Sequence, residues 1–238
     1  MAVEVTSRFV LVMQLGPRTL ESAVSMLGQV AGCCGPTLPL LLSDNHLPYP
    51  AAILQVFGQV LHRRRHWRRG RLKHKWLKPP PGLLAGVVLK VRDDSGKLLK
   101  VKTKALFGRL KDIRGKIKRF KLGNDINTAH VERFNGTARG RSARLARRTR
   151  DVSRRRTPLR AALGLLRDVY NFVHPHAALD GATPAMAIGL AEVPWSVRRY
   201  VTYPVHTADW QQMIWAEELE NQTRSALNGP KAQQRVPT

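Results

Sequence analysis

Three carboxylates lie at the ends of expected secondary-structure elements in a chain that is otherwise strongly basic. Glu4 lies in an expected first strand, Asp44 ends a short apolar strand, and Glu132 lies near the start of an expected helix. A sheet with a flanking helix can bring such positions together. Converging carboxylates repel one another unless cations lie between them, and hard oxygen ligands favour Mg²⁺ or Mn²⁺. Because two such ions can activate the attacking oxygen and stabilise the leaving oxygen of a phosphodiester, these acids are candidates for catalysis and metal binding.

The expected helix around Glu132 also carries candidates for nucleic-acid contact. Asn135 and Arg139 follow Glu132 at i+3 and i+7, close to the same face, and Arg133 is adjacent to it. In this interpretation Glu132 binds metal while Arg139 holds a phosphate. The spacing alone favours a simpler alternative, in which Glu132 is an exposed acid that pairs with nearby arginines.

The composition favours a polyanionic partner. Lysine and arginine total 41 against 16 acidic residues, which gives a formal net charge of +25. Nucleic acid fits this charge better than an acidic small molecule or a neutral protein surface does. A ribosomal or histone-like protein that only neutralises phosphate has a similar composition, so composition leaves both classes open.

The basic charge is densest between Arg63 and Lys78. This stretch holds nine lysines or arginines, no acid, and the interleaved Trp67 and Trp76. Aromatic faces among cations can stack bases while the cations hold phosphates. A solvated loop or a localisation-type tract is the alternative. The candidate nucleic-acid contacts in this stretch are Arg68, Arg69, Arg71 and Lys73.

The first third of the chain predicts strands and helices in alternation. Residues 2–5 and 8–16 predict a β-hairpin, and a helix follows with Thr19 as its N-cap and Gly32 or Gly35 as its end. The apolar run 38–44 then predicts a buried central strand that delivers Asp44 at its C-terminal edge.

The rest of the chain predicts a basic hairpin and a series of helices. Residues 49–61 predict a helix, and residues 87–108 predict a hairpin around an Asp-Ser-Gly turn with a cationic face that includes Lys90. After a basic connector, residues 126–150 and 157–173 predict helices. The second of these has an apolar stripe and Thr157 as its N-cap, and Thr183 starts a further short helix.

This order of elements predicts an α/β domain with a mixed sheet. The apolar runs 9–13 and 38–42 are far shorter than the roughly 20 residues that span a bilayer, and the N-terminus does not resemble a cleaved signal. Cys33 and Cys34 are adjacent, which fits neither a zinc site nor a disulfide framework and favours thiols in a reducing compartment. We therefore expect a cytoplasmic protein without a membrane segment.

Five stretches in order along the chain resemble the DDE transposases of bacterial insertion sequences. They are GPRTLESA (16–23), LSDNHLPYPAAI (42–53), VVLKV (87–91), INTAHVERFNGT (126–137) and YNFVHPHAALDGATPAMA (170–187). The resemblance implies the ribonuclease H-like catalytic core that this family shares with retroviral integrases, with a mixed sheet flanked by helices. It also implies that Asp44 and Glu132 are the second and third catalytic acids, and it aligns Glu4 with the first.

The sequence departs from the family at the first acid, where Glu4 stands in place of the usual Asp. The extra methylene moves the carboxylate by about 1.5 Å, and a misplacement of about 1 Å can cost roughly 100-fold in rate. Met1 lies only three residues before Glu4. The resemblance therefore also predicts an N-terminally truncated copy.

The resemblance predicts three parts of the chain and one main function. Residues 1–190 form the catalytic core with a basic insertion at about 62–122, residues 191–225 form a helical extension, and residues 226–238 form a disordered tail. With two Mg²⁺ or Mn²⁺ ions, the core would cleave DNA at the element ends and transfer the freed 3′-hydroxyl into target DNA, as a homo-oligomer on DNA. The main alternative is an inactive remnant that only binds nucleic acid. An RNA-binding ribosomal-type protein would explain the charge but not the ordered motifs.

Overall fold

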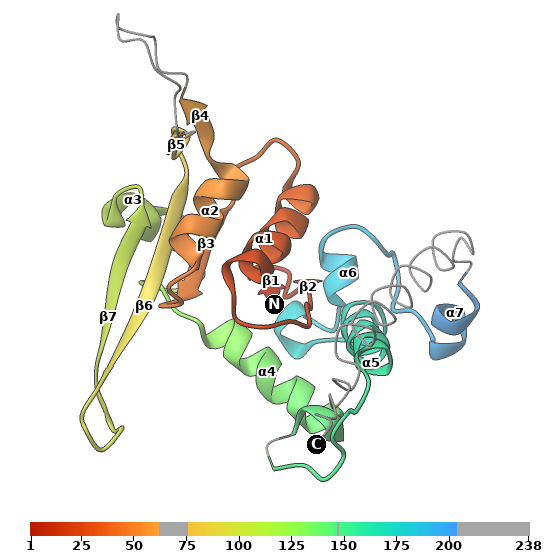
Figure 1. The fold of residues 1–238 in the computed structure, drawn as a ribbon. Helices are drawn as coiled ribbons and strands as arrows, with labels where there is room; N and C mark the ends of the chain where they lie inside the picture. Colours follow the sequence, from red (N-terminus) through yellow and green to blue (C-terminus); the bar gives the residue numbers. More distant parts are fainter. Residues whose placement is uncertain (62–75, 147, 204–238) are drawn as a thin grey trace, which may run out of the picture. The chain divides into compact units, whose positions relative to one another are not determined.

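The computed structural model describes residues 1–61, 76–146 and 148–203. The chain divides into two compact units, residues 1–194 and the unit that begins at Trp195. In the first unit a mixed sheet is flanked by helices, as the sequence predicts at this coarse level (Figure 1). The nucleic-acid candidates Arg68, Arg69, Arg71 and Lys73 and the expected tail 226–238 lie outside the described residues.

The mixed sheet consists of β3 (Leu40–Asp44), β6 (Leu84–Arg92) and β7 (Leu98–Phe107), in the order β3-β6-β7. Strand β3 runs parallel to β6, and β6 and β7 form an antiparallel hairpin. The predicted hairpin is therefore confirmed. Its turn includes Gly96 with φ 82°, a left-handed conformation that glycine adopts without steric cost.

Strand β3 lies at an edge of the described sheet, so the prediction of a central strand is wrong. Strands β1 (Ala2–Val3) and β2 (Val10–Val12) confirm the expected N-terminal hairpin, but they pair with each other in a separate two-stranded sheet. The residues of β3 are half-buried, and its last residue, Asp44, is exposed. A short apolar run indicates a strand without specifying how many neighbours that strand has.

Helix α1 (Leu20–Cys34) has the ends that the sequence predicts. The hydroxyl of Thr19 accepts a hydrogen bond from the Ser22 N–H at 3.4 Å, as an N-cap does. Gly35 follows the last turn with φ 58°, so it is Gly35 rather than Gly32 that ends the helix.

Helix α2 (Tyr49–Phe57) is shorter than predicted, because the chain leaves the helix at Gly58. There the backbone becomes extended, and β4 (Gln59–Leu61) pairs with β5 (Trp76–Lys78). A Cβ atom at Gly58 would lie 2.1 Å from the carbonyl oxygen of Leu54. The prediction of a helix through residue 61 missed this glycine as a helix end.

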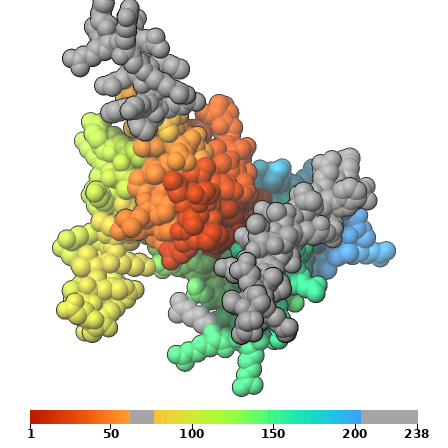
Figure 2. Space-filling model, in the orientation of Figure 1, coloured from red at the N-terminus to blue at the C-terminus, as the bar shows by residue number. Residues whose placement is uncertain are grey.

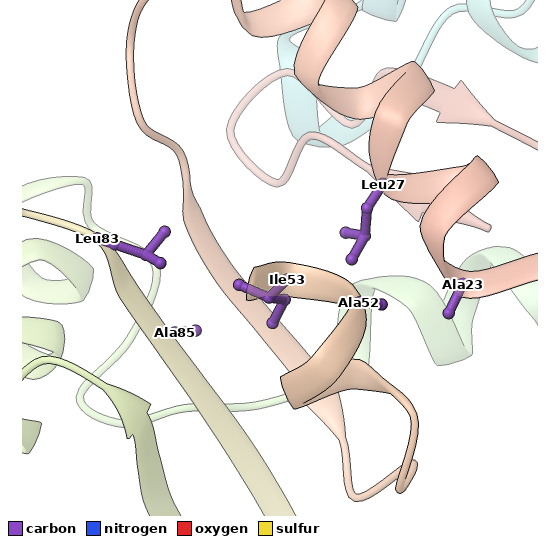
Figure 3. Close-up of a cluster of buried hydrophobic side chains, with 6 residues drawn as sticks. All are labelled: Ala23, Leu27, Ala52, Ile53, Leu83 and Ala85. Atoms are coloured by element: carbon purple, nitrogen blue, oxygen red, sulfur yellow. The ribbon is translucent and has the colours of Figure 1, made fainter. Parts of the chain in front are cut away.

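Two apolar clusters cover opposite faces of the sheet. Figure 3 shows the first, in which side chains from α1 and α2 meet the start of β6; its buried members are Ala23, Leu27, Ala52, Ile53, Leu83 and Ala85. The second joins Leu84 and Val88 of β6 to Ile113, Ile117 and Ile126. Because successive strand residues point to opposite faces, Leu84 and Ala85 belong to different clusters.

Helix α3 (Leu110–Arg119) occupies the segment that the sequence predicts as a basic connector. Ile113 and Ile117, one helical turn apart, are fully buried against the sheet. The guanidinium of Arg114 donates two hydrogen bonds to the Asp125 carboxylate, at 3.1 and 2.9 Å. The connector prediction is therefore wrong: two isoleucines suffice for an apolar stripe that the surrounding lysines and arginines conceal.

Helix α4 (Ala129–Arg141) carries Glu132 and confirms the middle of the predicted helix 126–150. It ends where Ser142 takes an extended conformation, and a short 3-10 turn, η1 (Ala143–Leu145), follows. Phe134 and Ala138 of α4 are buried, so the helix is held by the apolar face that lies beside Glu132.

Helix α5 (Arg156–Asp168) continues into a π-helical turn, η2 (Val169–Val173). The predicted N-cap is wrong by two residues, because Arg155 occupies that position and Thr157 lies inside the first turn. After a 3-10 turn, η3 (Ala177–Leu179), helix α6 (Pro184–Ala187) starts as predicted. The Thr183 hydroxyl caps α6 by accepting a hydrogen bond from the Met186 N–H at 3.3 Å.

In the second unit the described residues contain α7 (Val197–Thr202). The Ser196 hydroxyl accepts from the Arg199 N–H at 3.1 Å, and the Arg199 guanidinium lies 4.9 Å from the centre of the Trp195 ring. Within the ranges that the structure describes, no helix is long and apolar enough to cross a membrane.

Candidate carboxylate site

Asp44 ends β3 opposite Val88 of β6. Its side chain is 62% exposed, and Nη2 of Arg18 lies 3.9 Å from its Oδ2 atom. Burial and then the negative charge of Asp44 raise the pKa of the neighbouring Tyr49 hydroxyl. Asp44 is thus an accessible carboxylate, and the exposed Arg18 guanidinium lies near it at the outer limit of an ion pair.

Glu132 lies in the first turn of α4 and contacts two donors. Its Oε1 atom accepts hydrogen bonds from Nζ of Lys90 at 2.5 Å and from the Thr128 hydroxyl at 3.0 Å. The Lys90 hydrogen bond, followed by that of Thr128, lowers the pKa of Glu132 below its ordinary value. The carboxylate is therefore ionised near neutral pH and already holds one cation.

The position of Lys90 on β6 shows where Glu132 lies with respect to Asp44. Lys90 follows Val88 by two residues on β6, so the two residues share a face of the strand and lie about 7 Å apart along it. Asp44 adjoins the first of these residues and Glu132 contacts the second. The two acids, 88 positions apart in sequence, therefore adjoin positions of β6 that are two residues apart, at the end of the β3–β6 pairing. Lys90, predicted as a nucleic-acid contact, has its ammonium on Glu132.

The Glu4 carboxylate closes the turn between β1 and β2. Its Oε2 atom accepts hydrogen bonds from the Ser7 hydroxyl and from the Ser7 N–H at 2.6 Å, and Oε1 accepts from the Thr6 N–H at 3.0 Å. Burial raises the pKa of Glu4, but the hydrogen bonds from Ser7 and Thr6 outweigh burial, so the pKa lies below its ordinary value. In this arrangement Glu4 has a local structural role.

The N-terminal residues around β1 lie near Asp44 and also near the helix that carries Glu132. The Met1 amino group is near enough to Asp44 for that charge to raise its pKa against the larger, lowering effect of burial. Val3 of this strand and His130 of α4 line one small pocket of ≈ 60 Å³. In the described part of the chain, the hydrogen bonds to the Glu4 carboxylate nevertheless come from its own turn. In residues 1–61, 76–146 and 148–203, no group of three His, Cys, Asp or Glu is arranged to hold a metal ion.

The remaining candidates on α4 differ in exposure. Arg139 is exposed, Asn135 is half-buried, and Arg133 is exposed at the rim of the small pocket that His130 lines. Arg139 thus keeps an accessible guanidinium on the helix that carries Glu132.

Asn171, a residue that our sequence interpretation assigned no role, joins η2 to β2. Its side-chain oxygen accepts from the Val10 N–H at 2.9 Å, and its amide nitrogen donates to the Val10 carbonyl at 3.0 Å. The side chain is almost completely buried. The Tyr-Asn pair at 170–171 was part of the motif quoted above, and only the long-range contact shows that this Asn is structural.

The Lys90–Glu132 contact predicts a pH-dependent effect of Lys90→Gln. Because the folded-state pKa of Glu132 is lowered, the contact stabilises the fold above the pKa of unfolded Glu and loses this contribution as the pH falls through the folded value. We expect Lys90→Gln to raise the pKa of Glu132 and to lower stability near neutral pH but not in acid. An NMR titration of the Glu side-chain carboxyls and urea unfolding at both pH values measure the two effects.

Arg109→Gln is the matched control, since Arg109 pairs with Asp112 on α3 instead. An unchanged Glu132 pKa in Lys90→Gln, or an equal shift in the control, would contradict the contact.

Comparison with known proteins found no match: no protein-family description, no curated protein and no solved structure matches the chain.

Proposed function

We propose that the chain is the catalytic core of a DDE transposase, with a ribonuclease H-like arrangement, that cleaves DNA strands and transfers the 3′-hydroxyl as a homo-oligomer on DNA. The observation that carries the proposal is the position of Asp44 and Glu132 at one end of the β3–β6 pair. These are the two acids that the family resemblance selects, and both adjoin β6, where Asp44 pairs with Val88 and Glu132 contacts Lys90.

The surface charge supports DNA as the substrate. The β6–β7 hairpin, yellow in Figure 2, lies at the surface, and Lys100, Lys102 and Lys104 of β7 are exposed on it. Lysines spaced along a strand can follow a phosphate backbone, and such contacts give the sequence-independent part of DNA affinity.

Asp44 and Glu132 suit Mg²⁺ or Mn²⁺, because both are accessible carboxylates with a basic group beside them that a harder cation can replace. When bound, such ions supply the charge that activates an attacking oxygen and stabilises the leaving one. Glu4 fits this role only after its carboxylate leaves the hydrogen bonds of its turn. In this proposal Arg139, an exposed guanidinium two helical turns beyond Glu132, holds a phosphate.

A second candidate function is nucleic-acid binding without turnover. The observation that favours it is the Glu4 carboxylate, whose two oxygens are occupied by Ser7 and Thr6. This candidate predicts salt-sensitive DNA binding and no metal-dependent products.

A cleavage and joining assay distinguishes the two candidates. The substrate is a labelled duplex from the DNA that flanks the coding region, with Mg²⁺ or with EDTA. We expect nicked and joined products only with Mg²⁺, a loss of roughly 100-fold or more in Glu4→Gln, and retained activity in Glu4→Asp. Ser7→Ala is the matched control, because it removes the hydroxyl donor of the turn but leaves the Glu4 carboxylate and its two backbone donors intact. Salt-sensitive binding without metal-dependent products would favour the second candidate, and full activity in Glu4→Gln would remove Glu4 from the site.

A further inference from the structure

A basic pocket lies between the end of α4 and the start of α5, apart from the carboxylate site. It has a volume of ≈ 830 Å³. Among the described residues, its charged lining consists of five arginines and one acid: Arg141, Arg144, Arg150, Arg154, Arg155 and Asp151. Most residues of the segment 148–156 that leads into α5 are exposed, and part of this segment is visible at the surface in Figure 2.

The five arginines outnumber the one acid, Asp151, that lines the pocket with them in the described part of the chain. Among the described residues, none forms an ion pair with any of them. The Ser153 hydroxyl also lines the pocket; its oxygen is buried and has no hydrogen-bond partner in the described part of the chain. Like charges around one concave surface repel one another, and a bound polyanion removes that repulsion.

The donors of this pocket match phosphate groups. A guanidinium presents a planar fork of N–H groups that binds two phosphate oxygens at once, and a serine hydroxyl adds a further donor. The guanidinium groups come from the end of α4, from η1 and from the segment 150–155. Because they come from separate segments, they can contact more than one phosphate of the same strand.

We propose that this pocket binds the phosphate backbone of duplex DNA. The inference rests on the proposed function, which makes DNA the polyanion that the protein meets. Arg141 follows Glu132 by nine residues on α4, which corresponds to about 14 Å along the helix. For a duplex whose axis runs parallel to α4, a rise of about 3.4 Å per nucleotide puts the pocket roughly four nucleotides from the bond that faces Glu132.

Equilibrium binding of a labelled duplex in EDTA, at several salt concentrations, tests the proposal. The variant Arg144→Gln, Arg150→Gln, Arg154→Gln removes three charges from the pocket. The matched control, Lys111→Gln, Lys118→Gln, Arg119→Gln, removes three exposed charges from α3. Each phosphate contact contributes about 0.9 to the slope of log K against log salt, so we expect the pocket variant to lose about 3 in slope and on the order of 100-fold in affinity at 0.1 M salt. The control should change far less.

An unchanged slope and affinity in the pocket variant, or an equal loss in the control, would overturn the proposal. Titration with inorganic phosphate is the small-anion arm, and a pocket that binds it as tightly as duplex DNA also contradicts the proposal. If the triple variant fails to fold, maleimide labelling of Val152→Cys in a Cys33→Ser, Cys34→Ser background replaces it, and duplex DNA must then slow the labelling.

Because this test contains no metal, its outcome is independent of strand cleavage. A wild-type chain without metal-dependent products contradicts the proposed catalytic function and leaves the binding result standing. Loss of DNA binding in the α3 control alone contradicts the pocket proposal and leaves the proposed catalytic function standing.

Discussion

Glu132→Gln is expected to lower the rate of Mg²⁺-dependent strand cleavage on the order of 1,000-fold, because it removes a charged ligand from ions that supply several kcal/mol to the transition state. Gln is close to Glu in size and keeps the oxygen that accepts from Thr128 and Lys90. The fold should therefore remain intact. Single-turnover cleavage of the flanking duplex with saturating Mg²⁺ measures the effect.

Duplex binding in EDTA separates this loss of chemistry from a loss of affinity. Glu132→Gln removes a negative charge and leaves Lys90 without an ionic partner on Glu132, so binding without metal should be equal to or tighter than that of the wild type. Glu192→Gln, which changes an exposed acid of the same type, is the control and should cleave at the wild-type rate. Cleavage by Glu132→Gln within a few-fold of wild type would exclude Glu132 from the site.

Phe134→Ala is expected to have the largest effect on stability, a loss of about 3–5 kcal/mol in the free energy of unfolding. Phe134 is 2% exposed, and its ring lies edge-on to Tyr170 with 4.8 Å between the ring centres. With Val10 and Ala138 it forms the cluster that holds α4 against β2 and η2. Deletion of the ring leaves a cavity at the anchor of the helix that carries Glu132.

Urea unfolding followed by circular dichroism measures the Phe134 effect as a lower midpoint with an unchanged denaturant slope. Phe120→Ala is the matched control, because Phe120 ends α3 with half of its surface exposed, and its loss should be within about 0.5 kcal/mol. Equal effects of the two substitutions would show that the Phe134 cluster does not anchor α4.

Much of the local structure was predictable from the sequence. The caps at Thr19 and Thr183 and the Asp-Ser-Gly hairpin depend on residues within a few positions of one another, and all three are confirmed. The local signals that we misread were also short-range. Gly58 breaks a predicted helix, and Glu4 precedes two donors, Thr6 and Ser7, at the spacing of a side-chain-closed turn.

The candidate site was predictable only in part. The resemblance selected Asp44 and Glu132, and the strand that ends at Asp44 and the helix that carries Glu132 both exist. Lys90 was predicted as a DNA contact, and the contact of its ammonium group with Glu132, 42 positions away, was not predicted. Spacing cannot predict such a contact, because it depends on how β6 and α4 pack.

The sequence by itself determined most of the alternation of strands and helices, the caps at Thr19 and Thr183, the strongly basic character and the acids worth testing. These follow from side-chain periodicity, local hydrogen bonds and charge, which act over a few residues or over the whole composition. Only the tertiary structure decided that β3 is an edge strand, that Asn171 holds Val10 from 161 positions away and that five arginines line one pocket. Those features arise when distant elements bury their apolar faces together, and the polar groups at their ends then acquire neighbours that no local pattern encodes.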